Sequence, residues 1–256
     1  MNVQQFYDDL APYYDLIFED WAASMTRQGA AISQLLEAEL GASGAPGSAR
    51  VLDVACGIGT QTLPLAARGY RVTGRDLSPA AVARLGREAA ARRLSVQVDV
   101  ADMRSIASAV VAPFDVVLAF DNSIPHLLTD GDILTAFRQF KAVLRPGGVC
   151  ICSVRDYDQL QRGAPVTLPY GEHSRGLDRF LVRQEWIWHG PMHYDVTFVI
   201  EKRGPEGPTS VLRTTTEYYA VSVATLLTLM GQAGLVDCRR VDNLIYQPVL
   251  VGRNVT

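Results

Sequence analysis

The sequence lacks the features that typify membrane, secreted and nucleic-acid-binding proteins. No apolar run reaches the roughly 20 residues that a membrane-spanning helix needs, and the first residues lack the charged-then-apolar pattern of a signal peptide. The formal net charge is −3, and arginines gather in no more than pairs such as Arg92-Arg93, whereas a protein that binds nucleic acid usually has a basic face. We therefore expect neither a membrane nor a nucleic-acid partner.

Cysteine is scarce as well. The four cysteines, Cys56, Cys150, Cys152 and Cys238, have neither the spacing of a zinc site nor that of a disulfide framework. In a strand, Cys150 and Cys152 would face the same side and pack as small apolar side chains. Free thiols are typical of a reducing compartment, so we expect a cytoplasmic protein that holds no metal.

The most informative segment that is present is an apolar run ending in a Gly-x-Gly turn, at residues 51–59 (VLDVACGIG). A buried strand that ends in such a turn and leads into a helix lets backbone N–H groups approach a nucleotide-like ligand. Gly57 and Gly59 permit this because a Cβ would block the approach or forbid the backbone angles. The pattern predicts a nucleotide-type cofactor.

A second strand supports this interpretation. It ends at Asp76, about 20 residues after the turn, where a carboxylate can accept hydrogen bonds from ribose hydroxyls. The competing interpretation of Asp76 is a helix-capping residue. Together with the turn, the carboxylate favours a ligand that contains adenosine.

The residues around the turn favour S-adenosylmethionine over a dinucleotide. A dinucleotide site needs a third small residue where the pyrophosphate meets the helix, and this position holds Thr62. Asp53 lies just before the glycines, where its carboxylate would repel a pyrophosphate and attract an ammonium group. S-adenosylmethionine combines adenosine with an α-amino group, so we expect it as the cofactor. A nicotinamide-dependent oxidoreductase is the less favoured alternative.

Short apolar runs alternate with helical segments across residues 49–155, which indicates a doubly wound parallel sheet with helices on both faces. We predict an α/β fold with a Rossmann-like, seven-stranded sheet as the cofactor-binding core. Its expected strands are 51–55, 70–75, 95–98, 114–120, 149–154, 236–241 and 244–251. The expected helices between them include 79–91 and 133–144, and Arg145-Pro146-Gly147-Gly148 is expected to form a tight turn.

Other segments flank this core. Residues 1–41 carry apolar side chains at helical spacing in two stretches, one up to Phe18 and one from Trp21 to Leu40, and predict an N-terminal helical cap. After Val154 the alternation of strands and helices stops, and residues 156–219 predict an antiparallel β insert on the substrate side. Its expected strands are 180–189, 193–203 and 211–219, with turns at 190–191 and 204–208. Residues 220–256, with a helix at 221–233, then return the chain to the core sheet.

With these motifs placed, the chain resembles class I S-adenosylmethionine-dependent methyltransferases, and among them the glycine and glycine/sarcosine N-methyltransferases. Residues 51–57 match the first motif of the superfamily. Residues 122–127 (NSIPHL) resemble that subfamily's Asn-Ser-x-x-His-Leu segment, and residues 155–158 (RDYD) resemble its Arg-Asn-Tyr-Asp run. Tyr218-Tyr219 matches a paired tyrosine that precedes the late helix.

The resemblance implies roles for individual residues. The implied cofactor-binding residues are Tyr14, Trp21, Arg27, Asp53, Ala55, Gly57, Gly59, Asp76, Leu77, Asp102, Met103 and Phe120. Among these, Arg27 would bind the cofactor's carboxylate, and Asp102-Met103 would lie over the adenine. The implied substrate-facing residues are Tyr7, Asn122, Arg155 and Tyr219, and the implied catalytic residues are Asn122, Arg155 and His126. Phe18 departs from the family, because it has no hydroxyl for a substrate contact.

Some of these residues have a structural alternative. Arg155 follows the last parallel strand, at the edge where ligands bind in open α/β sheets, and can hold a carboxylate through two parallel hydrogen bonds. Its alternative is an ion pair with Asp156 or Asp158. A histidine such as His126 is more often structural than catalytic. Tyr218 and Tyr219 point to opposite faces of a strand, so at most one of them faces the site.

We therefore expect methyl transfer to a small-molecule acceptor by in-line displacement, with the nitrogen of a small amine or amino acid as the favoured acceptor. The sulfonium of the cofactor is already activated, so the protein has mainly to position the reactants and exclude water. The alternative is an O- or C-methyltransferase for a small aromatic or polyketide-like metabolite, with Trp186, Trp188 and Phe198 facing the pocket. A cofactor-binding scaffold without turnover is a further alternative, and both a monomer and a homo-oligomer are compatible with the sequence.

Overall fold

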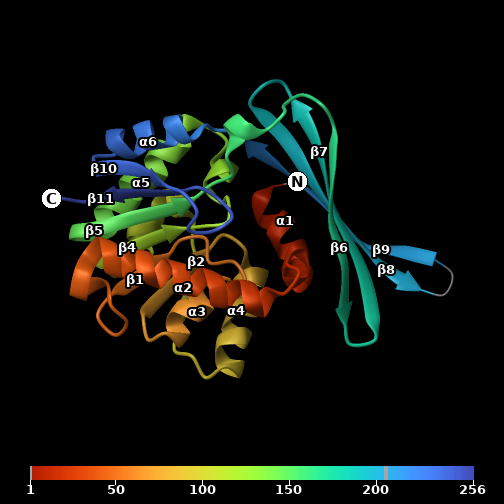
Figure 1. The fold of residues 1–256 in the computed structure, drawn as a ribbon, viewed down its shortest axis with the longest axis horizontal. Helices are drawn as coiled ribbons and strands as arrows, with labels where there is room; N and C mark the ends of the chain where they lie inside the picture. The colour runs from red at the N-terminus through yellow and green to blue at the C-terminus, as the bar shows by residue number, and fades with distance from the viewer. Residues whose placement is uncertain (1, 205–206) are drawn as a thin grey trace.

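Two β-sheets and a short N-terminal helix organise the protein. The computed structural model describes residues 2–204 and 207–256. A seven-stranded sheet with helices on both faces forms the core, and a separate four-stranded antiparallel sheet stands beside it (Figure 1). Helix α1 (Val3–Leu10) lies between the two (Figure 1). Within the described residues, no helix is both long enough and apolar enough to cross a membrane.

The core sheet has the predicted Rossmann-like arrangement. Its strand order is β10-β11-β5-β4-β1-β2-β3. The strands are β1 (Arg50–Asp53), β2 (Arg71–Asp76), β3 (Gln97–Val100), β4 (Phe114–Ala119), β5 (Leu144–Ser153), β10 (Val236–Val241) and β11 (Val249–Arg253). The first five run parallel to one another, and at one edge β11 pairs antiparallel with both β5 and β10. The strand order reverses between β1 and β4, the place where open α/β sheets bind ligands at the carboxyl ends of their strands.

Alternating side chains of the core strands pack against different helices. Val116 and Leu118 of β4 join the cluster that includes Ile32 of α2, whereas Val117 and Ala119 join the cluster that includes Phe137 of α5. A parallel strand covered on both faces is apolar at nearly every position for this reason. The helices are α2 (Trp21–Leu40), α3 (Thr62–Ala67), α4 (Pro79–Ala91), α5 (Asp130–Val143) and α6 (Val223–Gln232). Short 3-10 helices are η1 (Ala11–Ile17), η2 (Gly41–Gly44), η3 (Met103–Ser108), η4 (Ile124–Leu127) and η5 (Tyr157–Gln159).

The second sheet has one strand more than the sequence predicted. Its order is β6-β7-β8-β9, with β6 (Val166–Arg175), β7 (Asp178–His189), β8 (His193–Gly204) and β9 (Gly207–Tyr219). The missed strand, β6, is an edge strand whose register shifts between Pro169 and Gly171, and both residue types argue against a strand in sequence. Of the turn expected at 204–208, residues 205 and 206 lie outside the described residues.

Several other boundaries differ from the expectation. The first helix ends at Leu10, because Pro12 interrupts the α-helical hydrogen bonding, and the chain continues as η1. Strand β11 begins at Val249 instead of Leu244, so residues 242–248 form a loop. The expected turn at 145–148 is an irregularity within β5, between the pairings of Leu144 and Val149.

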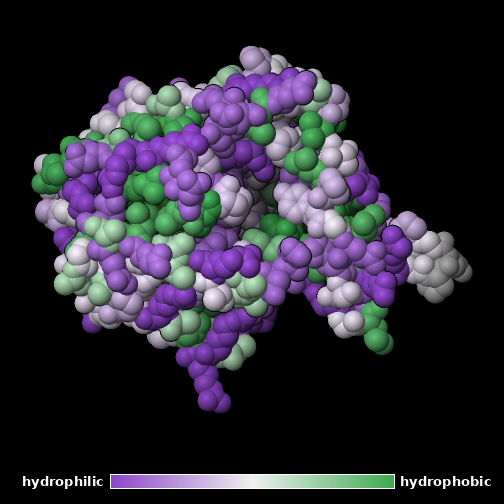
Figure 2. Space-filling model, in the orientation of Figure 1, coloured by the Kyte–Doolittle hydropathy of each residue, from purple (hydrophilic) through white to green (hydrophobic). Residues whose placement is uncertain are grey.

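Helix α1 is fixed to the core and to the second sheet. The carboxylate of Asp8 accepts hydrogen bonds from Ser78 Oγ at 2.6 Å and from the Ala80 N–H at 3.0 Å, at the start of α4. Phe6 is fully buried and contacts Phe198 of β8. Figure 2 shows that the surface is hollowed between the core and the second sheet. The N-terminal segment therefore borders the space at the carboxyl ends of the core strands.

Candidate functional site

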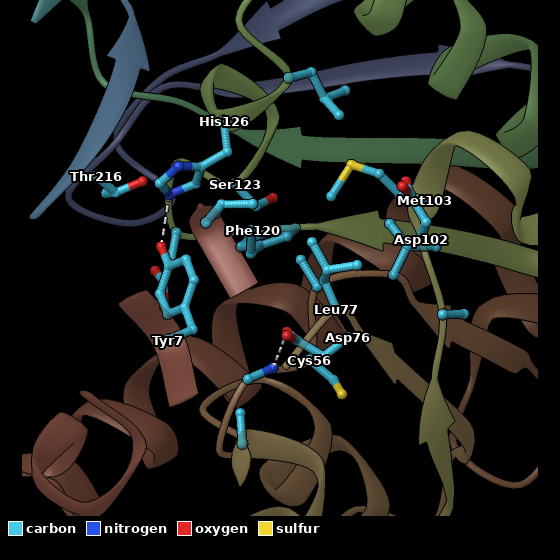
Figure 3. A pocket seen from close by; sticks show the side chains of 18 of the residues that line it. Tyr7, Cys56, Asp76, Leu77, Asp102, Met103, Phe120, Ser123, His126 and Thr216 are labelled. Atoms are coloured by element: carbon cyan, nitrogen blue, oxygen red, sulfur yellow. Dashed lines mark hydrogen bonds between the residues drawn. The ribbon is translucent and has the colours of Figure 1, made fainter. Parts of the chain in front are cut away.

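The carboxyl ends of β1, β2 and β4 border a cavity of about 530 Å³, within the roughly 300–1,000 Å³ typical of small-molecule sites. Leu77, Asp102 and Met103 lie on one side of it, and Tyr7 and His126 lie on the opposite side (Figure 3). The turn after β1 forms its floor through Ala55, Cys56 and Gly57, and Phe120 closes another wall; we call this the large cavity.

The two glycines of the turn have different roles. Both have a positive φ, +49° at Gly57 and +104° at Gly59. A Cβ on Gly57 would meet no atom within 4 Å and would project into open space, and Gly57 borders the large cavity. A Cβ on Gly59 would lie 2.5 Å from Leu85 Cδ1 and 2.7 Å from Leu63 Cδ1. Gly59 therefore allows α3 and α4 to pack behind the turn, and the expectation that it lines the cofactor site is not met.

Asp76 forms hydrogen bonds with the backbone and also borders the large cavity. Its Oδ2 accepts a hydrogen bond from the Gly57 N–H at 2.8 Å, and its Oδ1 accepts one from the Ser78 N–H at 2.9 Å. Burial raises the pKa of Asp76, and these backbone hydrogen bonds oppose the effect. The carboxylate also borders the large cavity, and a carboxylate has about four acceptor sites, so it can accept a further hydrogen bond from a ribose hydroxyl. Asp76 thus shapes the turn and presents an acceptor to a ligand.

Asp53 does not face the large cavity. It is fully buried, where it accepts hydrogen bonds from Thr62 Oγ1 at 2.7 Å and from the Ala55 N–H at 3.4 Å. Burial raises the pKa of Asp53 to about 7. The expectation that its charge attracts a ligand ammonium is therefore wrong in its geometry, because Thr62 and the turn backbone satisfy the carboxylate inside the protein.

Two residues expected from α2 do not border the large cavity. Arg27 lies on the exposed side of the helix, and Trp21 donates a hydrogen bond from Nε1 to Thr60 Oγ1 at 3.0 Å behind the turn. Gln28 takes the inward position, because Met25, Gln28 and Ile32 form the buried stripe of α2. Its Oε1 accepts a hydrogen bond from Gln61 at 2.8 Å.

Leu77, Asp102 and Met103, which were expected near the adenine, border one side of the large cavity. Leu77 and Met103 supply apolar walls, which suit a flat base. The Asp102 carboxylate pairs with Arg104 at 2.6 Å, and this interaction lowers its pKa. Asp102 therefore remains charged and paired at the rim of the large cavity.

A second cavity of about 160 Å³, the small cavity, adjoins the large one. Tyr7, Tyr14 and Asp121 border both. The remaining wall of the small cavity comes from segments far apart in sequence: Leu10, Ile17, Phe18, Asn122, Arg155, Tyr170, Gln184, Phe198, Tyr218, Tyr246 and Gln247. A ligand in the small cavity would therefore meet a ligand in the large cavity at the three shared side chains.

Arg155 faces the small cavity and does not form the ion pair that was its structural alternative. Asp156 pairs with Arg240, and Asp158 pairs with Arg162. The Arg155 guanidinium instead donates a hydrogen bond to Tyr194 Oη at 2.9 Å and lies 4.4 Å from the centre of the Trp186 ring. No ion pair within residues 2–204 and 207–256 includes it, so the cavity contains a guanidinium without a carboxylate partner.

Asn122 fixes the backbone near Arg155. Its Oδ1 accepts a hydrogen bond from the Arg155 N–H at 2.9 Å, and its Nδ2 donates one to Tyr157 Oη at 2.8 Å. Asn122 is almost fully buried and borders the small cavity. Its expected contact with a substrate remains a prediction.

Comparison with known proteins identifies the family of this architecture. Residues 51–148 match the methyltransferase domain family. The chain is 31% identical over 193 residues to the glycine/sarcosine N-methyltransferase of Parasynechococcus marenigrum (strain WH8102), in an alignment that covers 75% of this chain and 63% of that protein. The core therefore contains a methyltransferase domain, at residues 51–148.

Solved structures share the fold of the methyltransferase domain and its additions. The TM-score is 0.76 with the CcbJ methyltransferase from Streptomyces caelestis, over 100% of both chains at 20% identity. It is 0.77 with CalS10, an amino pentose methyltransferase from Micromonospora echinaspora, over 95% of each chain at 18% identity. At these identities the likeness concerns the fold. The chain spans less than two thirds of the length of the first curated relatives that it matches.

His126 of the large cavity contacts Tyr7, which borders both cavities. His126 Nε2 lies 2.7 Å from Tyr7 Oη (Figure 3). Burial lowers the pKa of His126 to about 3, so the ring is neutral, and its Nε2 shares a hydrogen bond with the tyrosine hydroxyl. Tyr218 packs on the same imidazole, with 4.0 Å between ring centres, and borders the small cavity.

Tyr219 was expected to face the substrate, but of the paired tyrosines it is Tyr218 that borders a cavity. Tyr219 donates a hydrogen bond to Asp130 at 2.9 Å and stacks on His193, and it borders neither cavity. Alternation along β9 directs Tyr218 inward and Tyr219 away from the site. Tyr218 is therefore the substrate-side candidate of the pair.

Several residues of the site were not expected from sequence. Asp121 and Gln61 border the large cavity, and Tyr170, Gln184 and Tyr246 border the small one. Asp121 could have been found, because it directly follows the fourth strand, at the edge where ligands bind. Tyr246 carried no such signal, because its position depends on a loop that was predicted to be a strand.

Proposed function

We propose that this protein binds S-adenosylmethionine in the large cavity and transfers its methyl group to the nitrogen of a small acceptor that carries a carboxylate. The acceptor would occupy the small cavity. The observation that carries the proposal is Arg155, a guanidinium without a carboxylate partner in a cavity of about 160 Å³ beside the large one.

The large cavity fits the cofactor. Gly57 leaves open space above the turn, Asp76 offers carboxylate lone pairs, and Leu77 and Met103 form an apolar wall where a base would lie. The methyltransferase domain and the SAM-bound structure of CalS10, which shares the fold, support the same cofactor.

The small cavity favours an amino-acid-like acceptor. A planar guanidinium binds a carboxylate through two parallel hydrogen bonds, which fix the orientation of a small ligand. Trp186 covers one face of the Arg155 guanidinium, so its edge is the part that remains for a ligand. The relative from Parasynechococcus marenigrum, named as a glycine/sarcosine N-methyltransferase, supports an acceptor of this kind.

The chain's own residues would act by positioning and by excluding water. When bound, the cofactor supplies a methyl group already activated on a sulfonium. Arg155 would hold the acceptor carboxylate, and Tyr7 and Tyr14 would align the nitrogen at the border between the two cavities. Good alignment lowers the barrier of an in-line displacement because the entropy of bringing the reactants together has already been lost on binding.

An aromatic or polyketide-like acceptor is supported less well. It would leave the Arg155 guanidinium buried without a counter-charge, which is costly. Of the aromatic residues expected to face such an acceptor, Phe198 borders the small cavity. Trp186 instead covers Arg155, and Trp188 stacks on Tyr194.

The test combines an acceptor panel with two variants of Arg155. Glycine, sarcosine, dimethylglycine, an amino pentose without a carboxylate and small phenols would be incubated with isotopically labelled S-adenosylmethionine, and the products identified by mass spectrometry. We expect methylation of a carboxylate-bearing amine. Arg155→Lys should lower kcat/KM for this acceptor at least about tenfold, since a charge-assisted hydrogen bond contributes about 1.5–3 kcal/mol, and Arg155→Ala should lower it further.

Arg162→Lys is the matched control, because Arg162 pairs with Asp158 and borders neither cavity. Calorimetry with S-adenosylhomocysteine should give the same affinity for all variants within about twofold. Equal turnover by the wild type and both Arg155 variants would overturn the carboxylate-binding role. Methylation of the phenols alone would favour the tailoring enzyme instead.

A further inference from the structure

Asp121 is the second charged group of the small cavity without a counter-charge, and it also borders the large cavity. Its Oδ2 accepts a hydrogen bond from Gln61 Nε2 at 3.0 Å, and its Oδ1 accepts one from Tyr246 Oη at 2.8 Å. Both donors are neutral. Among the residues that the structure describes, none with a positive charge acts on this carboxylate.

The backbone holds Asp121 in a costly conformation. Asp121 and Asn122 both have a left-handed backbone, with φ of +55° and +64°. Consecutive non-glycine residues rarely adopt it, and they do so where the surrounding structure enforces it, often at functional sites. Here the Asp121 N–H donates to Ser153 Oγ at 2.8 Å, and the Asn122 N–H donates to the Ser153 carbonyl at 3.2 Å. The carboxylate is thereby held at the junction of the cavities.

The hydrogen bonds of Asp121 come from groups that a ligand can replace or supplement. Tyr246 is 68% exposed and belongs to the loop 242–248. The same loop is anchored by Gln247, whose Oε1 accepts a hydrogen bond from Ser153 Oγ at 2.9 Å. One hydrogen bond to each oxygen leaves a lone pair on both, so the carboxylate can also accept a hydrogen bond from a cation in the small cavity.

Two opposite charges without partners in one small cavity match a zwitterion. Burying either charge alone is unfavourable, and a ligand with a carboxylate and an ammonium would neutralise both, at Arg155 and at Asp121. A simple carboxylic acid would neutralise only Arg155, and a simple amine only Asp121.

We propose that Asp121 binds the ammonium group of the acceptor and takes the proton that the nitrogen must lose before it can attack. This inference rests on the proposed function, because it assigns the second end of the acceptor. The proton moves from nitrogen to a carboxylate oxygen of Asp121. The nitrogen lone pair then forms the N–C bond as the C–S bond breaks, which yields the methylated ammonium and the neutral thioether. Asp121 returns its proton to water when the product leaves.

The surroundings of Asp121 are consistent with this role. Burial raises the pKa of its carboxyl, and the hydrogen bonds from Gln61 and Tyr246 oppose this effect. The titratable and charged groups around it are Tyr7 and Tyr14 from the N-terminal segment, Tyr246 from the loop 242–248, Asp53 and Asp76 from the ends of β1 and β2, His126 from η4, and Arg155 after β5. Asp53 and Asp76 are themselves acidic, so neither can neutralise the negative charge of Asp121.

The first test measures binding, independently of turnover. The full chain saturated with S-adenosylhomocysteine would be titrated calorimetrically with sarcosine, a zwitterion, and with acetate, which lacks the amine. The wild type should bind sarcosine at least tenfold more tightly than acetate, and Asp121→Asn should remove this preference while acetate affinity changes less than twofold. Asparagine is tolerated in a left-handed backbone, so the variant keeps the local conformation.

Asp237→Asn is the matched control, because Asp237 is exposed, has a φ of +53° and borders neither cavity. It should bind both probes as the wild type does. A wild-type complex without preference for sarcosine would overturn the proposal, as would an Asp121→Asn complex that keeps the preference. Loss of S-adenosylhomocysteine affinity with an unchanged preference would make Asp121 a cofactor residue and would equally overturn it.

The second test uses the pH profile of kcat/KM on the acceptor found by the panel. The rate should rise with pH as Asp121 loses its proton, and this rise should be absent in Asp121→Asn. Tyr246→Phe removes a hydrogen bond that stabilises the charged carboxylate, so it should move the rise to higher pH. An unchanged profile in both variants would contradict the proton transfer. If the wild type methylates no member of the panel, the proposed function fails, while the binding test still decides the role of Asp121.

Discussion

At the residue scale, the aspartates near the turn differ in exposure to the large cavity and in the groups that donate hydrogen bonds to them. Asp76 and Asp121 border the large cavity, whereas Asp53, which is only two residues before the turn backbone of Ala55, is enclosed. Thr62 and the Ala55 N–H satisfy Asp53 without any positive charge. Its carboxyl is therefore a structural group whose charge opposes folding at high pH.

The effect of Asp53 should appear in the pH dependence of the free energy of unfolding. The pKa of Asp53 rises from 3.8 to about 7 on folding, so between these values the folded state binds more protons than the unfolded state. Its contribution to stability is complete below about 4 and is lost as the pH rises through about 7. Each pKa unit corresponds to about 1.36 kcal/mol, so the loss amounts to a few kcal/mol.

Asp53→Asn should lack this contribution, while its amide oxygen still accepts the hydrogen bond from Thr62. Urea unfolding at a series of pH values would give the difference in free energy between wild type and variant, with Asp237→Asn as the exposed control. A difference that stays constant from pH 4 to pH 8 would show that Asp53 is not protonated in this range.

At the scale of elements, the strand–turn–helix unit joins ligand access and packing in three residues. Gly57 faces open space, and Gly59 faces Leu63 and Leu85. The first glycine of the Gly-x-Gly pattern therefore leaves space for a ligand, and the second leaves space for the packing of α3 and α4.

Alanine substitutions should separate these two roles. Gly59→Ala should lower the free energy of unfolding by on the order of 1–3 kcal/mol, the usual cost of overpacking, with further strain from a positive φ. Gly57→Ala should cost about 1–2 kcal/mol for its left-handed backbone but should weaken S-adenosylhomocysteine binding, because its Cβ enters the large cavity. Thermal unfolding and calorimetric titration of both variants would test this, and equal loss of stability with unchanged binding would contradict it.

At the scale of the whole molecule, one carboxylate joins three parts of the structure. Asp15 of η1 pairs with Arg84 of α4 at 2.8 Å and with Arg175 of β6 at 2.7 Å. Arg175 also donates a hydrogen bond to the Pro12 carbonyl at 3.1 Å. The N-terminal segment is thereby fixed between the core and the second sheet, over the site.

Asp15→Asn should loosen this connection. Partly exposed ion pairs contribute about 0.2–1 kcal/mol each, so we expect a loss of roughly 1 kcal/mol that decreases at high salt. Hydrogen exchange should become faster in residues 3–17 and 166–175 and stay unchanged in the core strands. Asp158→Asn, which breaks one pair with Arg162, is the control. If hydrogen exchange in residues 3–17 and 166–175 of the Asp15 variant is as slow as in the wild type, Asp15 does not link these segments.

The sequence by itself determined the fold class and the place of the site, because both follow from local patterns. The alternation of apolar runs and helical stretches specified the doubly wound sheet, and the bounds of α2, α4 and β10 follow from their own periodicity and caps. The Gly-x-Gly turn and the carboxylate of Asp76 predicted the edge of the sheet at which the large cavity lies. Arg155 was found in the same way, from its position after a parallel strand.

Only the tertiary structure decided which side chains face the two cavities. The packing of α2 placed Gln28 inward and Arg27 outward, and Thr62 enclosed Asp53. The pairing of Tyr246 with Asp121 joins segments 125 residues apart in sequence. Such contacts depend on how distant segments pack together, whereas spacing in sequence specifies only neighbours within one element. The charge pattern of the small cavity is therefore a property of the folded chain, because Arg155 and the oppositely charged Asp121 come from different segments.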